Sequence, residues 1–480
     1  MSRNLKHSSP CSARSLPTRK TLSENLLPKM YEKEVEKAKT KLQAGQAVCL
    51  TTDGWTSDNN DSFIAVTAHY IADSKLESTM LGCVEYAERH TAANLAEFLK
   101  KVTQDWDIEH RVTAVASDNA ANVTTAIKTA GWRKVPCFAH TLNLCVQTAL
   151  AAISTTTSRV KNVVEYFKRS SHAQAKLLDM QRQLGVPLLK LKQDVVTRWN
   201  STYDMFRRII LVKSAVAATL AVLRPDLILH NSDWQIIEMA VPILKIFSDV
   251  TIEISAEKNV TLSKVIPLCS ILIVNAKQLL DAEQPVLEVS MMVEILLGEL
   301  ERRFHHIENS ELHAEAALLD PRFKDVRFRD KALAERAINN LKMKVGRQRP
   351  PPNASTCQLD SANQPSTSAQ KSTPSSLWEQ FDLKVKKLVP TNPTAAGIVE
   401  FEKYMQEPML SRTSEPFAWW HERRVVYPRL YNFMLKRLNL VATSVPCERI
   451  FSKAGNILTE RRRRLTSKKV SQLLFISCNI

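Results

Sequence analysis

The sequence has 480 residues, of which 44% are hydrophobic, so the chain is long enough for about three domains and apolar enough for a large core. Its formal net charge of +17 and pI near 9.4 favour a polyanionic partner, most often a nucleic acid. Uncharged apolar stretches of about 18 residues are missing, and the first residues carry no apolar signal core, so neither a membrane span nor secretion is expected. The 9 cysteines show no paired spacing, which fits a reducing compartment.

The first third of the chain predicts a tail, a helix and then an α/β segment. Residues 1–21 are polar, with serine, proline and basic side chains interleaved, and are predicted to be a disordered tail. Residues 22–46 are predicted to form a helix that has Pro28 in its first turn and stops at Gly45. Residues 47–137 then alternate in the order strand, strand, strand, helix, strand, helix, which predicts a mixed α/β domain.

Two aspartates in the α/β segment follow short apolar runs. Asp53 comes after the run at 47–50, and Asp118 comes after the run at 112–116. Because α/β sheets place their ligands at strand ends, these carboxylates are candidates for binding a hard cation such as Mg²⁺. A turn or helix-cap role is the alternative for each.

Residues 138–396 are predicted to be helical almost throughout. The exception is 346–376, where three prolines open a stretch rich in serine, threonine, glutamine and proline that is predicted to be a disordered loop. At the start of the helical region, Cys137 and His140 have a Cys-x-x-His spacing. A fourth zinc ligand is missing from this pattern, so the pair is predicted to be structural.

The Arg198–Trp199 pair lies inside this helical region and has two interpretations. An exposed tryptophan can stack on an extruded base while the neighbouring guanidinium holds a phosphate. Equally, Trp199 can be a buried aromatic anchor with Arg198 in an ion pair. The sequence leaves both interpretations open.

Residues 397–480 combine a dense aromatic patch with a final amphipathic helix. Most of these apolar side chains are expected to pack within one subunit, and an exposed subset is expected to mediate dimerisation. The candidates for that interface are Trp419, Trp420, Tyr427, Leu473 and Leu474.

A short helix within this segment is predicted to start at Pro446, with Ser444 as its cap and Gly455 as its stop. Glu448 lies in the first turn, where it either compensates for the helix dipole or joins the two aspartates at a metal site. A basic run follows the helix and favours phosphate contact, nuclear import or both. The residues of this run are Arg461, Arg462, Arg463, Arg464, Lys468 and Lys469.

Five motifs in this order resemble the hAT transposase superfamily, and specifically its BED-finger branch of domesticated or recently mobile vertebrate proteins. The motifs are Thr52-Asp53-Gly54-Trp55-Thr56, Ser117-Asp118-Asn119, Cys137-Phe138-Ala139-His140, Arg198-Trp199-Asn200-Ser201-Thr202 and Cys447-Glu448-Arg449-Ile450-Phe451-Ser452. The resemblance implies a ribonuclease-H-like core interrupted by a large α-helical insertion, with a C-terminal dimerisation region that completes the core. It also implies catalytic residues Asp53, Asp118 and Glu448 that bind Mg²⁺ or Mn²⁺ during DNA cleavage and strand transfer.

The chain departs from that family pattern before residue 47, where no Cys-x-x-Cys motif and no histidine pair occur, so no BED zinc finger is detected. We therefore expect a nuclear protein whose partners are DNA, bound without sequence preference, and a second copy of itself. Whether the chain is an active nuclease stays open at this point. The alternative is a catalytically silent domesticated transposase that regulates transcription or chromatin through dimerisation.

Overall fold

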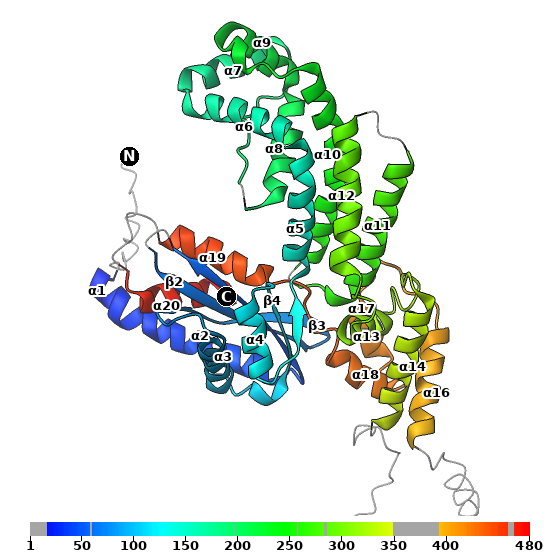
Figure 1. The fold of residues 1–480 in the computed structure, drawn as a ribbon. Helices are drawn as coiled ribbons and strands as arrows, with labels where there is room; N and C mark the ends of the chain where they lie inside the picture. The colour runs from blue at the N-terminus through cyan, green and yellow to red at the C-terminus, as the bar shows by residue number, and fades with distance from the viewer. Residues whose placement is uncertain are drawn as a thin grey trace, which may run out of the picture.

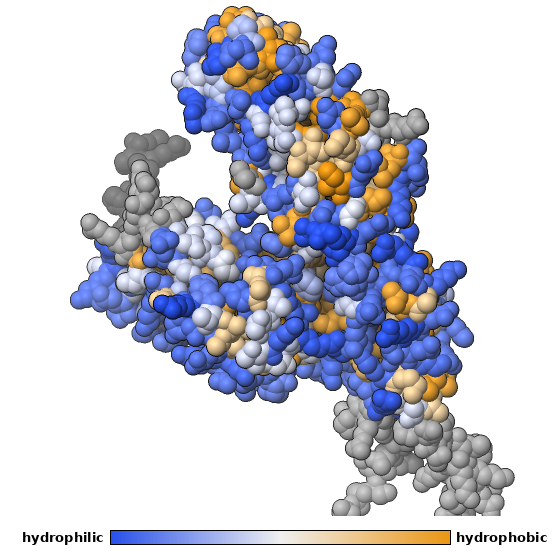
Figure 2. All heavy atoms as spheres, viewed as in Figure 1, coloured by the Kyte–Doolittle hydropathy of each residue, from blue (hydrophilic) through white to orange (hydrophobic). Residues whose placement is uncertain are grey.

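The computed structural model describes residues 17–57, 60–195, 197–256, 258–282, 286–348, 393–458 and 465–480. It is a mixed α/β structure in which a twisted sheet with helices around it stands beside an elongated helical region (Figure 1). Exposed apolar side chains, among them Leu184 and Val222, lie at the far end of that helical region (Figure 2). The predicted order of three strands, helix, strand and helix is confirmed.

The sheet has five strands in the order β3-β2-β1-β4-β5. Their bounds are Val48–Thr56 for β1, Ser62–Ala72 for β2, Lys75–Glu85 for β3, Val112–Ser117 for β4 and Lys134–Pro136 for β5. The pairs β1/β2 and β2/β3 are antiparallel, whereas β1/β4 and β4/β5 are parallel. Strand β2 is buried along most of its length on both faces, as expected for a strand that is covered by helices on each side.

Helices cover both faces of this sheet. One core joins the sheet to α2 (Leu27–Gln43), α3 (Ala92–Asp105) and α4 (Ala121–Thr129), and a second core joins it to α19 (Val445–Ile457) and α20 (Ser467–Asn479). Helix α20 also lies along β3 and against α2 (Figure 1). Helices α19 and α20 therefore belong to the same α/β unit as the first 130 residues.

The N-terminal helical stretch begins earlier than predicted. It starts with α1 at Arg19–Thr21 and continues through a π-helical turn, Leu22–Leu26, into α2. The cause is Thr18, whose side chain accepts a hydrogen bond from the backbone N–H of Thr21 and caps the first turn. The last residues of the expected disordered tail are therefore helical.

The helical region lies in the sequence between β5 and α19. Its helices are α5 (Phe138–Leu150), α6 (Ser154–Arg169), α7 (Ser171–Gln183), α8 (Trp199–Leu211), α9 (Lys213–Leu223), α10 (Asn231–Ile254), α11 (Val265–Asp281), α12 (Leu287–Phe304), α13 (Glu311–Leu319), α14 (Lys331–Arg347), α16 (Pro393–Gln406), α17 (Pro416–Glu422) and α18 (Pro428–Leu435). The segment Leu262–Asp281 is long and apolar enough to cross a membrane, yet 61% of its apolar window is buried against other parts of the chain, as in a core helix. Most of the predicted loop 346–376 lies outside the described residues.

Candidate active site

Asp53 lies on the face of β1 that α19 covers. Alternation along the strand gives its neighbours Thr51 and Trp55 the same orientation. The Thr51 Oγ1 lies 3.2 Å from the Cys447 Sγ, and the Trp55 ring stacks on Phe451 at a centroid distance of 5.9 Å. Both partners belong to α19, so the Asp53 side chain between the two contacts faces the first turns of that helix.

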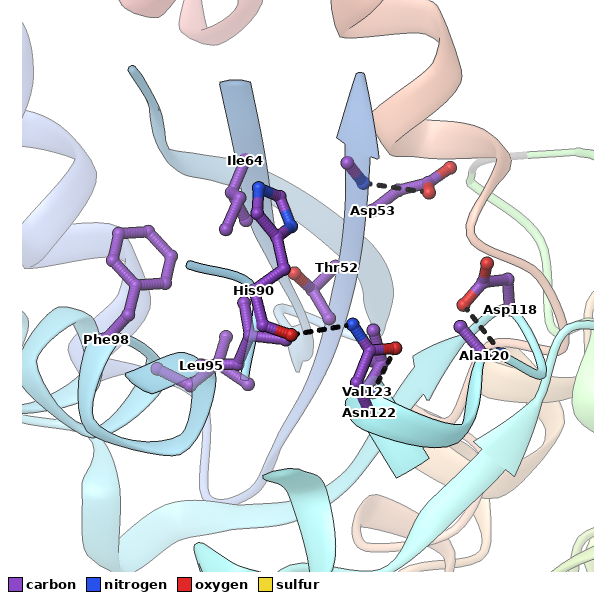
Figure 3. Close-up of a pocket in the computed structure, with 12 residues that line it drawn as sticks. Thr52, Asp53, Ile64, His90, Leu95, Phe98, Asp118, Ala120, Asn122 and Val123 are labelled. Atoms are coloured by element: carbon purple, nitrogen blue, oxygen red, sulfur yellow. Dashed lines mark hydrogen bonds between the residues drawn. The ribbon is translucent and has the colours of Figure 1, made fainter. Parts of the chain in front are cut away.

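Asp118 follows β4 directly and lies beside Asp53. Strands β1 and β4 run parallel with Thr51 paired to Ala116, so the two aspartates occupy equivalent positions two residues further on. Figure 3 shows both side chains at neighbouring strands of the sheet. The Asp118 Oδ1 accepts a hydrogen bond from the Ala120 N–H at 3.3 Å, which is the turn role considered above. Its second carboxylate oxygen leaves the side chain able to hold a ligand as well.

Glu448 is carried to this place by α19. The predicted burial of one helix face, with Ile450, Phe451 and Ala454, is confirmed. Pro446 lies in the first turn and Ser444 is the N-cap residue, as predicted, although the Ser444 side chain makes no cap hydrogen bond. The predicted C-terminal end is wrong, because Gly455 lies inside the helix, which continues to Ile457. A glycine ends a helix when it adopts the left-handed conformation, and Gly455 does not have the positive φ of that conformation.

An arginine from the helical region pairs with the glutamate. The Arg198 Nη2 lies 3.7 Å from the Glu448 Oε2, with 68% and 44% of the two side chains exposed. The next residue in α19, Arg449, donates a hydrogen bond to the Ser255 carbonyl oxygen at 2.7 Å. These contacts hold the start of α19 between the sheet and the helical region.

The three carboxylates interact electrostatically. Burial raises the pKa of Asp53 to about 7, a hydrogen bond from the Gly54 N–H opposes that rise, and repulsion by Asp118 and Glu448 adds to it. Burial and like charge both disfavour an ionised carboxylate, so half or more of Asp53 is protonated below pH 7. A cation placed between the carboxylates would lower the pKa of Asp53, because its positive charge favours the ionised carboxylate.

The donor set fits a hard divalent ion in its chemistry, because all three candidate ligands are carboxylates. The geometry is open, however: within the part of the chain that the structure describes, no group of three His, Cys, Asp or Glu side chains is close enough to hold one ion. Glu448 also pairs with Arg198.

The structural role predicted for Cys137 and His140 agrees with their contacts. Cys137 is buried and caps α5, and its sulfur accepts hydrogen bonds from the His140 N–H at 3.5 Å and the Ser444 N–H at 3.4 Å. The second of these bonds ties the start of α19 to the helical region. Metal-binding clusters that include this pair are absent from the described residues.

The contacts of Arg198 and Trp199 match the second interpretation of this pair. Trp199 is 3% exposed and packs edge-on against Phe247, with ring centroids 6.5 Å apart. A ring buried in this way offers no free face to a base, so the stacking interpretation is wrong for this conformation. Arg198 is exposed, and its guanidinium remains able to reach a phosphate.

Only part of the predicted basic run belongs to the described structure. Arg461, Arg462, Arg463 and Arg464 lie outside the described residues. Lys468 is exposed at the start of α20, whereas the Lys469 ammonium donates a hydrogen bond to the Ser23 hydroxyl in the N-terminal helix. Lys469 therefore has a structural contact within the chain.

The aromatic dimerisation candidates are in the core. Trp419, Trp420 and Tyr427 are buried, and the Trp420 Nε1–H donates to the Leu319 carbonyl oxygen at 2.9 Å. On the last helix Leu474 is buried and Leu473 is half-buried. The assignment of Trp419, Trp420, Tyr427 and Leu474 to an interface is corrected, because the folded chain already covers these side chains, whereas that of the half-buried Leu473 stays a prediction. Exposed apolar residues in the same region, such as Val425, were not predicted.

Three family models match the chain. The ZBED1 RNase-like domain matches residues 51–131, the ZBED1 RNase-like helical domain matches 135–242, and the hAT family C-terminal dimerisation region matches 400–480. The match to the RNase-like domain includes Asp53 and Asp118, and the match to the dimerisation region includes Glu448.

Curated relatives match along nearly the whole chain. The human "Zinc finger BED domain-containing protein 4" is 23% identical over 97% of this chain and 40% of its own length. The maize "Putative AC transposase" is 27% identical over 93% of this chain and 58% of its own length. The "Putative transcriptional regulator tpeD" of Talaromyces stipitatus is 23% identical over 96% of this chain and 57% of its own length. The chain thus spans about half the length of these relatives.

Proposed function

The chain belongs to the hAT transposase superfamily and its ZBED-like branch, and from that premise we propose a Mg²⁺-dependent DNA cleavage and strand-transfer centre at Asp53, Asp118 and Glu448. The observation that carries the proposal is the convergence of three carboxylates from distant parts of the sequence, with an Asp53 pKa raised to about 7 partly by the other two. Paired carboxylates near a strand end are the ligands that a two-metal phosphoryl-transfer site requires.

The sheet supports the finer assignment of a ribonuclease-H-like core. Strands β3, β2 and β1 pair in antiparallel fashion on one side of the sheet, and strands β1, β4 and β5 pair in parallel on the other. We regard the helices from α5 to α18 as an insertion between β5 and α19, because α19 contacts β1 and β2 although residues 138–444 separate it from the sheet.

In this proposal Asp53 and Asp118 hold the ion from adjacent strands, and Glu448 joins them when Arg198 releases it. Bound Mg²⁺ would neutralise charge on the phosphodiester and its attacking oxygen. Arg198 is a cation beside Glu448, and once apart from Glu448 its guanidinium can pair with a DNA phosphate. The hydrogen bond from Gly54 orients the Asp53 carboxylate toward the common space at the strand ends.

A metal titration tests this proposal without needing turnover. Mg²⁺ or Mn²⁺ should raise the thermal midpoint of the wild-type chain at pH 8, because the ion binds the folded state. Asp53→Asn and Asp118→Asn should abolish that rise and any metal-dependent nicking of duplex DNA. Glu36→Gln, a change at an exposed carboxylate on α2, is the matched control and should retain the rise. A wild-type midpoint that does not respond to either metal would refute the proposal.

The alternative is a catalytically silent regulator of transcription or chromatin. The ion pair between Arg198 and Glu448 favours it, because it occupies one of the three carboxylates. Under either alternative we propose a nuclear protein that contacts DNA and associates with a second copy through residues 400–480. Metal-independent behaviour of intact protein in the titration above, together with preserved self-association, would select the regulator.

A further inference from the structure

A groove lies between α7 and α9, at the end of the helical region that is remote from the sheet (Figure 1). Its volume is about 420 Å³. The side chains that line it include Lys176, Met180 and Arg182 from α7 and Val222 and Leu223 from α9. This tip groove, as we name it, shares no lining residue with the carboxylate site.

Apolar side chains at the tip groove face solvent. Val222 is 76% exposed, Leu184 at the end of α7 is 47% exposed, and Leu188 in the segment after α7 is 55% exposed. Figure 2 shows hydrophobic side chains gathered at this end of the helical region. Apolar surface that is gathered in one place and rimmed by polar side chains is typical of an interaction site.

The two walls of the tip groove differ in charge. Between residues 214 and 223, α9 has no ionisable side chain. On the α7 wall, the Arg182 Nη1 lies 2.7 Å from the Asp179 Oδ1, so these two charges compensate each other. The Lys176 ammonium has no ion-pair partner within the described part of the chain. The groove therefore combines an uncharged apolar wall with a wall that has one uncompensated positive charge.

This combination limits what the tip groove fits. A purely apolar ligand would leave Lys176 without a complementary charge, and DNA phosphates would face the apolar wall of α9. A second copy of this chain, with a formal net charge of +17, would approach against electrostatic repulsion. The positions of Lys176, Met180 and Gln183 recur at helical spacing, so about two turns of α7, roughly 10 Å, face the groove. A short helix with apolar side chains on one face and carboxylates on its flank satisfies all these conditions.

We propose that the tip groove binds an amphipathic helix of a partner protein, with apolar side chains against α9 and carboxylates beside Lys176. The apolar row of the partner would remove water from Val222 and Leu223 and supply most of the affinity. The carboxylates would fix the orientation of the helix, because only one wall of the groove is positively charged. The inference does not depend on the metal site and holds for an enzyme and for a silent regulator.

Fluorescence anisotropy with two designed peptides tests the inference on the full chain. The acidic probe is a fluorescein-labelled peptide of about 18 residues, in which leucines recur at helical spacing and glutamates occupy one flank. The basic probe has lysine in place of each glutamate. Val222→Asp and Lys176→Glu are the groove variants. Their matched controls are Ile252→Asp, at a 68% exposed position of α10, and Lys403→Glu, at an exposed position of α16.

The acidic probe should bind wild-type protein and both controls about tenfold or more tightly than the basic probe does. Val222→Asp should weaken that binding about tenfold or more, because a charge would be desolvated in the groove. Lys176→Glu should weaken binding of the acidic probe and strengthen binding of the basic probe. A misfolded variant would not show this reversal of preference.

Three results would overturn the inference. The first is equal binding of the acidic probe by wild-type protein and both groove variants. The second is displacement of the acidic probe by duplex DNA, which would assign the groove to nucleic acid. The third is loss of self-association in Val222→Asp but not in Ile252→Asp, measured by light scattering, which would assign the groove to a second copy. The test contains no metal, so its outcome is separate from that of the metal titration.

Discussion

The Thr51 hydroxyl lies 3.2 Å from the Cys447 thiol, although 396 positions separate the two residues in the sequence. The Thr51 oxygen is also 2.5 Å from the Thr67 hydroxyl, which in turn lies 2.8 Å from the His69 Nε2. A buried chain of polar groups thus runs across β1 and β2 and ends on α19. It joins that helix, which carries Glu448, to the strand that carries Asp53.

Breaking this chain should loosen α19. Thr51→Val keeps the shape of the side chain but leaves the Thr67 hydroxyl and the Cys447 thiol without a shared partner. We expect a loss of about 1–2 kcal/mol in the free energy of unfolding, measured by urea denaturation, and a weaker response to Mg²⁺. Thr125→Val, at an exposed site, should change stability by less than about 0.5 kcal/mol. Equal stability of the two variants would show that the contact contributes nothing.

The pH dependence of Asp53 gives a second prediction. The folded chain raises its pKa from 3.8 to about 7, so ionisation is easier in the unfolded chain, and stability falls as the pH rises between those values. Asp53→Asn removes this penalty. Without divalent ions it should be more stable than wild type by about 4 kcal/mol above pH 7, with the difference vanishing near pH 4. Calorimetric midpoints across that range measure it, and a difference independent of pH would contradict the raised pKa.

Two glycines in helices should respond oppositely to alanine. A Cβ at Gly397 would lie 2.7 Å from the Gly346 Cα, where α14 and α16 cross, so Gly397→Ala should destabilise the chain by about 1–3 kcal/mol. A Cβ at Gly455 meets nothing within 4 Å, so Gly455→Ala should stabilise α19 by about 0.5–1 kcal/mol. Chemical denaturation of both variants tests the pair. Destabilisation by Gly455→Ala would mean that the helix ends at that glycine after all.

Self-association should depend on exposed apolar residues of the C-terminal region rather than on its buried aromatics. Val425 and Val426 are 81% and 60% exposed within the segment matched by the dimerisation model. Replacing both with Asp should weaken self-association about tenfold or more, because a charge would be desolvated at the contact. Light scattering and sedimentation at micromolar concentration measure this. Val222→Asp, at the far end of the helical region, is the control, and equal effects of the two changes would exclude this surface.

DNA binding by the chain should be dominated by phosphates. We expect duplex dissociation constants of roughly 10⁻⁴–10⁻⁶ M at physiological salt, with an affinity that falls steeply as salt increases because counterions are released. Replacing Arg461 to Arg464 with Ala should reduce the slope of the binding affinity against salt concentration and weaken binding to unrelated DNA sequences about equally. Competition with scrambled duplexes is the measurement. A preference of roughly a thousandfold for one sequence would show that the chain reads bases.

The sequence by itself determined the strands, most helices and the identity of the three carboxylates. These features depend on local periodicity, on capping chemistry and on motifs in a fixed order, all of which are legible along the chain. Local signals also misled at Gly455, where a helix continues, and at Thr18, which starts the first helix earlier than composition suggested. Apolar residues in a subunit interface and in a core show the same spacing along the chain, so the sequence could not tell whether the C-terminal aromatics belong to one or the other.

Only the tertiary structure decided what the carboxylates face. The pairing of Glu448 with Arg198 and the burial of Trp199 depend on how α19 and the helical region meet the sheet. The raised pKa of Asp53 likewise follows from burial by segments hundreds of residues away. The cavity beside Asp53 and Asp118 has no sequence signal, because β2, α3 and α4 each contribute a few ordinary side chains to it. Long-range packing sets these properties, since desolvation and Coulomb interaction depend on distance in space rather than along the chain.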